Sequence, residues 1–68
     1  MSISITLNGE PRTIEDGLTI AALAEQIDLN PAKIAVERNL EIVPRSTLAD
    51  VMLADGDTLE IVHFVGGG

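Results

Sequence analysis

The last six residues of the sequence, HFVGGG, contain the group with the clearest chemical potential. Gly66, Gly67 and Gly68 have no side chains, so the reactive group at this end is the α-carboxylate of Gly68. A carboxylate with a pKa of about 3.5 is an anion at neutral pH. Its charge and its resonance make it a poor target for a nucleophile until it is activated, usually by ATP as an acyl-adenylate. The pattern therefore predicts a chain end that another enzyme activates.

Glycine also suits a chain end that must reach a nucleotide buried in the activating enzyme. Without a Cβ atom the chain passes a narrow channel and adopts extended or turned conformations at little steric cost. Fixing each backbone residue costs on the order of 1–2 kcal/mol of conformational entropy, so a docking surface elsewhere must supply the affinity. We expect residues 66–68 to form a flexible tail that follows a domain at residues 1–65.

The composition further limits the classes of function that the chain can have. The chain has 68 residues, enough for one domain, and no cysteine, which excludes disulfides and thiolate metal sites. Eleven acidic side chains against four basic ones give a net charge of −7. This charge disfavours binding to nucleic acid and favours a protein partner with a basic face. The start of the sequence lacks a signal-peptide pattern, and no apolar run reaches membrane-spanning length, so we expect a soluble cytoplasmic protein.

The first half of the sequence predicts a hairpin followed by a helix. Apolar and polar residues alternate at 2–7, and Asn8-Gly9 accepts the positive φ angles of a tight turn before a short edge strand at 10–15. Residues 18–29 change to helical spacing, with Thr19 as the N-cap. Asn30-Pro31 is expected to end this helix, because the residue before proline avoids the helical region.

The second half predicts three more strands, at 33–38, at 41–43 and at 58–65. A helical turn capped by Ser46 is expected between the last two, with Met52 as a core residue. The order of elements predicts an α+β fold of the β-grasp, or ubiquitin-like, arrangement. It consists of a mixed sheet of four to five strands with one main helix packed on one face.

The last strand carries information about a partner. Leu59 and Ile61 fall on the helix side, which leaves Val62 and Phe64 on the uncovered face. Exposed apolar residues beside a functional end indicate a docking surface, although scattered surface apolar residues are also common. The residues that we expect to contact a partner are Val62, Phe64, Val65, Gly66 and Gly67.

Two stretches, VERNLEIVPRS and LADGDTLEIVHFVGGG, make the sequence similar to the ThiS family of thiamine-pathway sulfur carriers, over essentially the whole chain. The resemblance implies that a ThiF-type enzyme uses ATP to adenylate Gly68. It also implies that sulfur from a cysteine desulfurase system then forms a thiocarboxylate, which donates its sulfur to thiazole synthase. In this cycle the chain is a protein cosubstrate with no bound cofactor or metal. Without cysteine it has no thiol to carry sulfur, so Gly68 is the candidate attachment site.

Two alternatives remain open at this stage. The small sulfur-carrying subunit of molybdopterin synthase shares the fold and the Gly-Gly end. A non-catalytic ubiquitin-like interaction module, with the glycines as an inert tail, requires no activation at all. A modifier role, with an isopeptide bond to target lysines, fits the thiamine-type motif less well.

The remaining polar residues show no catalytic pattern. His63 is the only histidine and is expected to be an ordinary strand residue. By the resemblance, Arg38 and Arg45 are candidate partner contacts, although solvated surface arginine is the simpler reading. Leu40 stands where the family often has glycine, and because a bulky residue disfavours positive φ, we expect another turn type at Asn39-Leu40.

Overall fold

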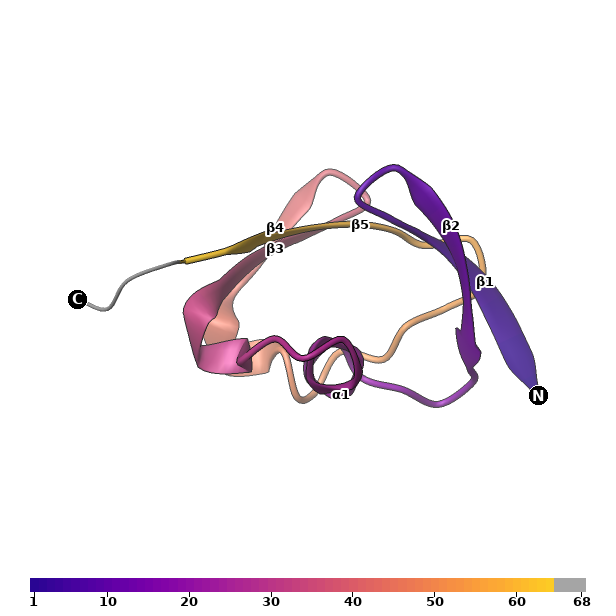
Figure 1. Ribbon diagram of the computed structural model, residues 1–68, viewed down its shortest axis with the longest axis horizontal. Helices are drawn as coiled ribbons and strands as arrows, with labels where there is room; N and C mark the ends of the chain where they lie inside the picture. The colour runs from indigo at the N-terminus through magenta and orange to yellow at the C-terminus, as the bar shows by residue number, and fades with distance from the viewer. Residues whose placement is uncertain (65–68) are drawn as a thin grey trace.

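The computed structural model describes residues 1–64. Five strands form one mixed sheet in the order β2-β1-β5-β3-β4, and a single α-helix crosses one face of it (Figure 1). The strands are β1 (Ser2–Leu7), β2 (Glu10–Glu15), β3 (Ile34–Arg38), β4 (Glu41–Val43) and β5 (Thr58–His63). The helix is α1 (Ile20–Gln26), and two short 3-10 helices are η1 (Pro31–Lys33) and η2 (Arg45–Thr47).

The strand order confirms the predicted β-grasp fold. The first and last strands, β1 and β5, lie parallel at the centre, and all other neighbouring pairs are antiparallel. Parallel neighbours need a crossover connection, which α1 and the segments after it supply. Because residues 65–68 lie outside the described part of the chain, the division into a domain at 1–65 and a tail at 66–68 stays a prediction.

The first hairpin forms as its sequence predicts. Asn8 and Gly9 have φ angles of 50° and 83°, which is the pair of positive values that a two-residue hairpin matched to strand twist requires. Pro11 lies opposite Thr6 in β2, at the edge of the sheet. A residue without an N–H group is tolerated at this edge.

The start of α1 is also confirmed. Thr19 is the N-cap, and its Oγ1 accepts a hydrogen bond of 3.1 Å from the backbone N–H of Ala22. This bond satisfies one of the donors that the first turn of a helix leaves without a partner.

The predicted end of the helix, at Asn30-Pro31, is wrong. The helix ends at Gln26, because Asp28 takes a φ of 63° and reverses the chain. The N–H of Leu29 donates to Ala24 O at 2.8 Å, and the N–H of Asp28 donates to Glu25 O at 3.1 Å. These two bonds make a Schellman motif, which closes the helix before the proline is reached.

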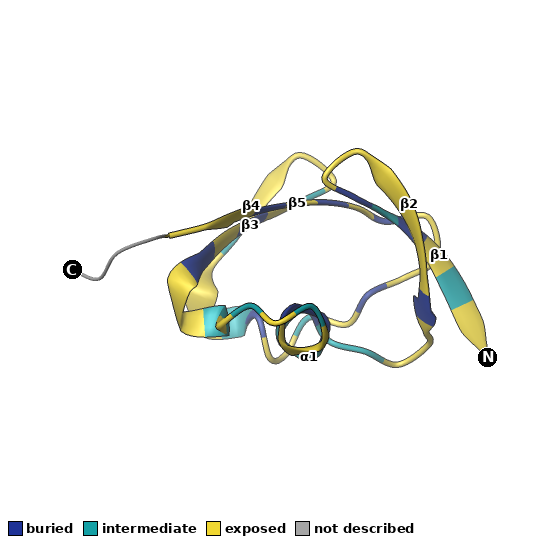
Figure 2. Cartoon of the chain, viewed as in Figure 1, coloured by how far each residue is buried: buried dark blue, intermediate teal, exposed yellow. Residues whose placement is uncertain are grey.

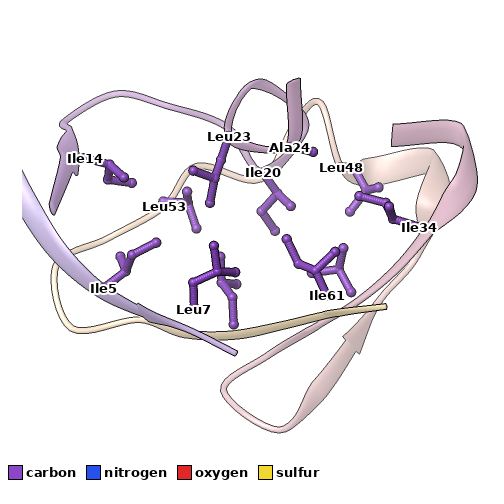
Figure 3. Close-up of a cluster of buried hydrophobic side chains, with 12 residues drawn as sticks. Ile5, Leu7, Ile14, Ile20, Leu23, Ala24, Ile34, Leu48, Leu53 and Ile61 are labelled. Carbon is purple, nitrogen blue, oxygen red and sulfur yellow. The ribbon is translucent and has the colours of Figure 1, made fainter. Parts of the chain in front are cut away.

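The core lies between α1 and the inner face of the sheet (Figures 2 and 3). It contains aliphatic residues from the helix, four strands and the segment before β5. These are Ile5, Leu7, Ile14, Ile20, Leu23, Ala24, Ile34, Val36, Leu48, Leu53, Leu59 and Ile61.

The segment between β4 and β5 differs from the prediction in two respects. Ser46 lies inside η2 and does not cap it, since the N-cap position is Pro44, whose side chain makes no capping hydrogen bond. Met52 is 54% exposed and is not a core residue. The N–H of Leu53 donates to Leu18 O at 2.9 Å, which fixes this extended stretch so that Leu53 is buried and Met52 is turned outward.

The hairpin between β3 and β4 contradicts the expected change of turn type. Asn39 and Leu40 have φ angles of 51° and 70°, so the bulky residue keeps the left-handed conformation. Asn39 accounts for this, because its side-chain Oδ1 accepts from Thr58 N at 3.0 Å while its backbone N–H donates to Thr58 O at 2.8 Å. These bonds to β5 hold the turn from outside. Leu40 itself is 90% exposed and gains little from burial.

Replacement of Leu40 by glycine is therefore expected to stabilise the protein. A left-handed residue with a Cβ atom costs about 1–2 kcal/mol, of which the greater freedom of glycine in the unfolded chain offsets about 0.5–1 kcal/mol. We expect Leu40→Gly to raise the free energy of unfolding by about 0.5–1 kcal/mol, measured by urea denaturation. Leu40→Ala is the control and should stay close to the original protein, since alanine meets the same backbone restriction. Equal midpoints for the glycine and alanine variants would contradict this account.

Candidate functional site

Two of the residues predicted to contact a partner, Val62 and Phe64, lie exposed at the end of β5. Leu59 and Ile61 are buried under the helix, whereas Val62 lies on the opposite face and is 59% exposed. Phe64, just after the strand, is 45% exposed. The alternation of buried and exposed residues ends at Ile61, since Val62, His63 and Phe64 are all exposed. Val65, Gly66, Gly67 and Gly68 lie outside the described residues, so their predicted roles remain predictions.

Phe64 is held at the end of the sheet by two neighbouring segments. Its N–H donates to Lys33 O at 2.8 Å, and the Cζ atom of Arg45 lies 5.9 Å from the centroid of its ring. The second contact is a cation–π interaction, which favours a guanidinium over an aromatic face. The position of Phe64 limits where Gly68 can act. Four residues span at most about 14 Å, so any enzyme that reaches Gly68 must bind close to Phe64.

A shallow hollow of about 160 Å³ lies beside these residues on the open face of the sheet. Ala35, Val36, Glu37, Ile42, Glu60 and Val62 line it. Ile42 is 81% exposed and was not among the predicted docking residues. The sequence contained a usable signal, since a two-residue turn at Asn39-Leu40 places Ile42 opposite Glu37 and hence on the open face.

The two arginines that were candidate partner contacts are both engaged within the chain. Arg45 contacts Phe64, as described above. The Nε of Arg38 donates a hydrogen bond to Asp57 Oδ2 at 2.9 Å, and the two side chains form an ion pair. Arg38 thus has a structural role within the chain, and contact of either arginine with a partner stays a prediction.

Asp57 is the buried centre of this polar cluster, at 5% exposure. In addition to Arg38, its carboxylate accepts from Ala54 N at 2.8 Å and from Asn39 Nδ2 at 3.1 Å. Burial alone raises the pKa of Asp57, but these three hydrogen bonds and the charge of Arg38 outweigh it. The pKa is held below its ordinary value of 3.8. The cluster ties β3, the following turn and the start of β5 together on the core side of the sheet.

The lowered pKa of Asp57 gives a testable pH dependence. The Asp57 carboxyl binds a proton more readily in the unfolded chain than in the folded protein. The stabilisation that ionised Asp57 gives to the fold is therefore fully present above pH 3.8. It is lost as the pH falls from there through the lower folded pKa. We expect the free energy of unfolding, measured in urea at a series of acidic pH values, to fall more steeply for the original protein than for Asp57→Asn. Parallel curves would show that Asp57 contributes no pH dependence.

The described residues offer little material for other chemistry. His63 is exposed and lies opposite Ile34 in β3. Within residues 1–64, no group of three or more His, Cys, Asp or Glu side chains could hold a metal ion. Over the same part of the chain, no helix has the length and apolar character needed to span a bilayer.

Known proteins resemble the chain over almost its whole length. The sulfur carrier protein ThiS of Bacillus subtilis is 42% identical over 65 residues, which cover 94% of this chain and 98% of that protein. A thiazole synthase from Paramagnetospirillum magneticum is 48% identical over 66 residues. That match covers 97% of this chain, and the chain spans only 20% of the length of that relative.

A solved structure and a family model agree with these relatives. The crystal structure of the thiamine biosynthesis protein ThiS from Geobacter metallireducens superposes with a TM-score of 0.78 at 31% identity. It covers 97% of this chain and 100% of that one. The model of the ThiS family matches residues 5–68, which include the glycines that follow Phe64. On the strength of this match and of the fold, the chain belongs to the ThiS family.

Proposed function

We propose that the chain is a sulfur carrier protein of thiamine biosynthesis and that the carboxylate of Gly68 is the point of sulfur attachment. The observation that carries this proposal is the family match, which runs through residue 68. The similarity to a sulfur carrier over nearly the full length of both proteins supports it. The absence of cysteine from the sequence supports the choice of the carboxylate over a thiol.

The chemistry proceeds in three steps at the carboxyl group of Gly68. In the first, an oxygen of the Gly68 carboxylate attacks the α-phosphorus of ATP, and pyrophosphate leaves. In the second, the outer sulfur of an enzyme persulfide, formed by a cysteine desulfurase system, attacks the acyl carbon, and AMP leaves. In the third, a thiol attacks the enzyme-side sulfur of the resulting acyl disulfide, so that the thiocarboxylate leaves and the thiol stays joined to the enzyme as a disulfide. The product is a thiocarboxylate, whose sulfur is available for transfer to the substrate of thiazole synthase.

The chain itself contributes binding and presentation. Val62 and Phe64 offer apolar surface at the end of β5, and the contacts of Phe64 with Lys33 and Arg45 fix the starting point of the last four residues. Gly66 and Gly67 let the chain end enter a narrow site, because they carry no Cβ atom. The catalytic groups belong to the ThiF-type adenylating enzyme and to thiazole synthase, so the chain acts as a cosubstrate and not as an enzyme.

The relative from Paramagnetospirillum magneticum supports thiazole synthase as a partner. In that protein a segment similar to this chain lies within a polypeptide that is called a thiazole synthase. Covalent linkage of two binding partners raises their effective concentration without any new contact. Such an arrangement is expected where carrier and synthase must meet repeatedly.

Mass spectrometry tests the proposal directly. The protein is incubated with ATP, cysteine, a thiol reductant, a desulfurase and the adenylating enzyme of its own organism, and its C-terminal peptide is then analysed. Replacement of oxygen by sulfur has nearly the same nominal mass effect as oxidation of methionine, and Met52 is exposed enough to oxidise. The change must therefore be localised to the C-terminal peptide or trapped with a thiol-selective alkylating agent.

Two results would overturn the proposal. One is an unchanged C-terminal peptide after incubation under sulfur-replete conditions. The other is transfer of the sulfur to the large subunit of molybdopterin synthase but not to thiazole synthase, which would assign the chain to the other pathway.

A further inference from the structure

We propose that Asn8 is a positioning residue for the reaction at Gly68: its side-chain amide fixes the direction in which β5 delivers the chain end to the adenylating enzyme. This inference rests on the proposed function and adds to it a residue of the first hairpin. Asn8 is far from Gly68 in the sequence, and its amide acts through Ile61, near the end of β5.

The central strand β5 outlasts one of its two neighbours. The register of β1 with β5 ends at the pair Leu7 and Leu59, where β1 turns into the first hairpin. β5 continues to His63, beyond the end of β1 (Figure 1). On the other side, β3 stays paired with β5 as far as His63. From Ile61 onward, β5 is therefore supported by β3 and by whatever takes the place of β1.

The side chain of Asn8 takes that place. The backbone N–H of Asn8 donates to Leu59 O at 2.9 Å and continues the ladder between the two strands. Its Oδ1 then accepts from Ile61 N at 2.8 Å, and its Nδ2 donates to Ile61 O at 3.3 Å. A carboxamide offers the donor and the acceptor of a peptide group. Asn8 thus extends the ladder to Ile61 although the backbone has already turned away.

The other hairpin beside β5 uses the same device at a different point. Asn8 and Asn39 have φ angles of 50° and 51°, a left-handed conformation that asparagine tolerates better than most residues. The side chain of each accepts a hydrogen bond from a backbone N–H of β5. Asn39 binds Thr58, the first residue of the strand, whereas Asn8 binds Ile61. Asn8 is therefore the one of the two that acts on the part of β5 that leads to the chain end.

The bonds of Asn8 connect the fold with the reaction. Together with the bond from Phe64 N–H to Lys33 O at 2.8 Å, they hold the end of β5 from both of its edges. The seven residues from Ile61 to Gly68 span at most about 24 Å, so a tilt of about 10° at Ile61 shifts the end of the extended segment by about 4 Å. Because a shift of about 1 Å can already cost a hundredfold in rate, the direction of β5 matters for the reaction.

Steady-state kinetics of thiocarboxylate formation with the ThiF-type adenylating enzyme test this role in the variant Asn8→Gly. Glycine accepts the same turn conformation and removes both bonds of the amide. We expect kcat to fall about tenfold, because the carboxylate of the bound chain lies in the reactive position for a smaller fraction of the time. The Kd for the enzyme, measured by titration calorimetry, should stay within about twofold, because Val62 and Phe64 are unchanged.

Thr19→Ala is the control for loss of stability. It removes the hydrogen bond that caps α1, away from β5, and should lower Tm by about 4–8 °C. Asn8→Gly is expected to lower Tm by a similar amount. If stability alone limited the reaction, the two variants would lose kcat equally. We expect Thr19→Ala to keep the original kcat.

Hydrogen exchange provides a readout on the protein without any enzyme. The N–H of Ile61 is bonded to Asn8 Oδ1, so it should exchange at least about tenfold faster in Asn8→Gly. The N–H of Leu53, which is bonded to Leu18 O on the helix side, is the internal reference. Its exchange should change much less, because the loss of support is local to the end of β5.

The outcomes separate this inference from the proposed function. If Asn8→Gly keeps the original kcat, or if Thr19→Ala loses as much, Asn8 has no positioning role. Equal acceleration of exchange at Ile61 and Leu53 also contradicts the inference, since the effect would then be global. If the original protein is never converted to a thiocarboxylate, the proposed function fails. Faster exchange confined to Ile61 would still support control of the end of β5 by Asn8.

Discussion

Addition of a single residue after Gly68, or removal of Gly68, is expected to reduce thiocarboxylate formation by at least about a thousandfold. The reacting atoms of an enzyme-bound pair must lie about 3–3.5 Å apart, and displacement by about 1 Å can already cost a hundredfold. One residue more or fewer moves the carboxylate by up to about 3.5 Å along an extended chain. The measurement is the initial rate of thiocarboxylate formation by mass spectrometry of the C-terminal peptide.

Controls can separate this effect from loss of folding or docking. Every core residue lies at or before Ile61, so both length variants should unfold at the same temperature as the original protein and bind the adenylating enzyme with similar Kd. Leu40→Gly, which alters the β3–β4 turn and leaves the chain end intact, should react at the original rate. Normal growth without thiamine of a strain whose only carrier lacks Gly67 and Gly68 would refute the proposed chemistry. It would instead favour a non-catalytic interaction module.

Asp57→Ala is expected to be the most destabilising single substitution outside the apolar core, by about 2–4 kcal/mol. The change removes the acceptor of hydrogen bonds from Arg38, Asn39 and the backbone of Ala54. A hydrogen bond to a charged group contributes about 1.5–3 kcal/mol, and donors left without a partner add to the loss. Domains have about 0.05–0.15 kcal/mol of stability per residue, or about 3–10 kcal/mol at this length, so the variant should lie near the limit of folding.

Urea denaturation at neutral pH measures this loss. Asp50→Ala is the matched control, because Asp50 is exposed and its side chain makes no hydrogen bond among those of the described residues. Its effect should stay within about 0.5 kcal/mol. Similar midpoints for the two alanine variants would mean that the Asp57 cluster does not hold β3 and β5 together.

The sequence was most informative where a local pattern has only one structural solution. Alternation at 2–7 and 58–63 identified the buried faces of β1 and β5, and Asn8-Gly9 identified the first hairpin, because these signals depend on neighbouring residues alone. The order of elements then limited the fold to a mixed sheet with one covering helix. The exposed positions of Val62 and Phe64 followed from the same alternation.

Predictions failed at three positions, where a local capping motif decided one conformation and distant contacts decided the other two. The end of α1 depended on Asp28 accepting a positive φ, which brings the N–H groups of Asp28 and Leu29 to carbonyls in the last turn of the helix. Leu40 keeps a left-handed conformation because Asn39 is bonded to Thr58, a residue far along the chain. Met52 is exposed because the hydrogen bond from Leu53 N–H to Leu18 O turns Leu53 inward and Met52 outward in an irregular segment.

By itself, the sequence determined the fold, the inner and outer faces of the main strands and the presence of a glycine-rich end. These properties follow from side-chain periodicity and from the missing Cβ atoms, which require no knowledge of distant neighbours. The tertiary structure alone decided which polar side chains form contacts within the chain and which remain available to a partner. It directs Arg38 to Asp57 and Arg45 to Phe64, and it places Glu37 opposite Glu60, because strand register brings together residues that lie far apart in the chain.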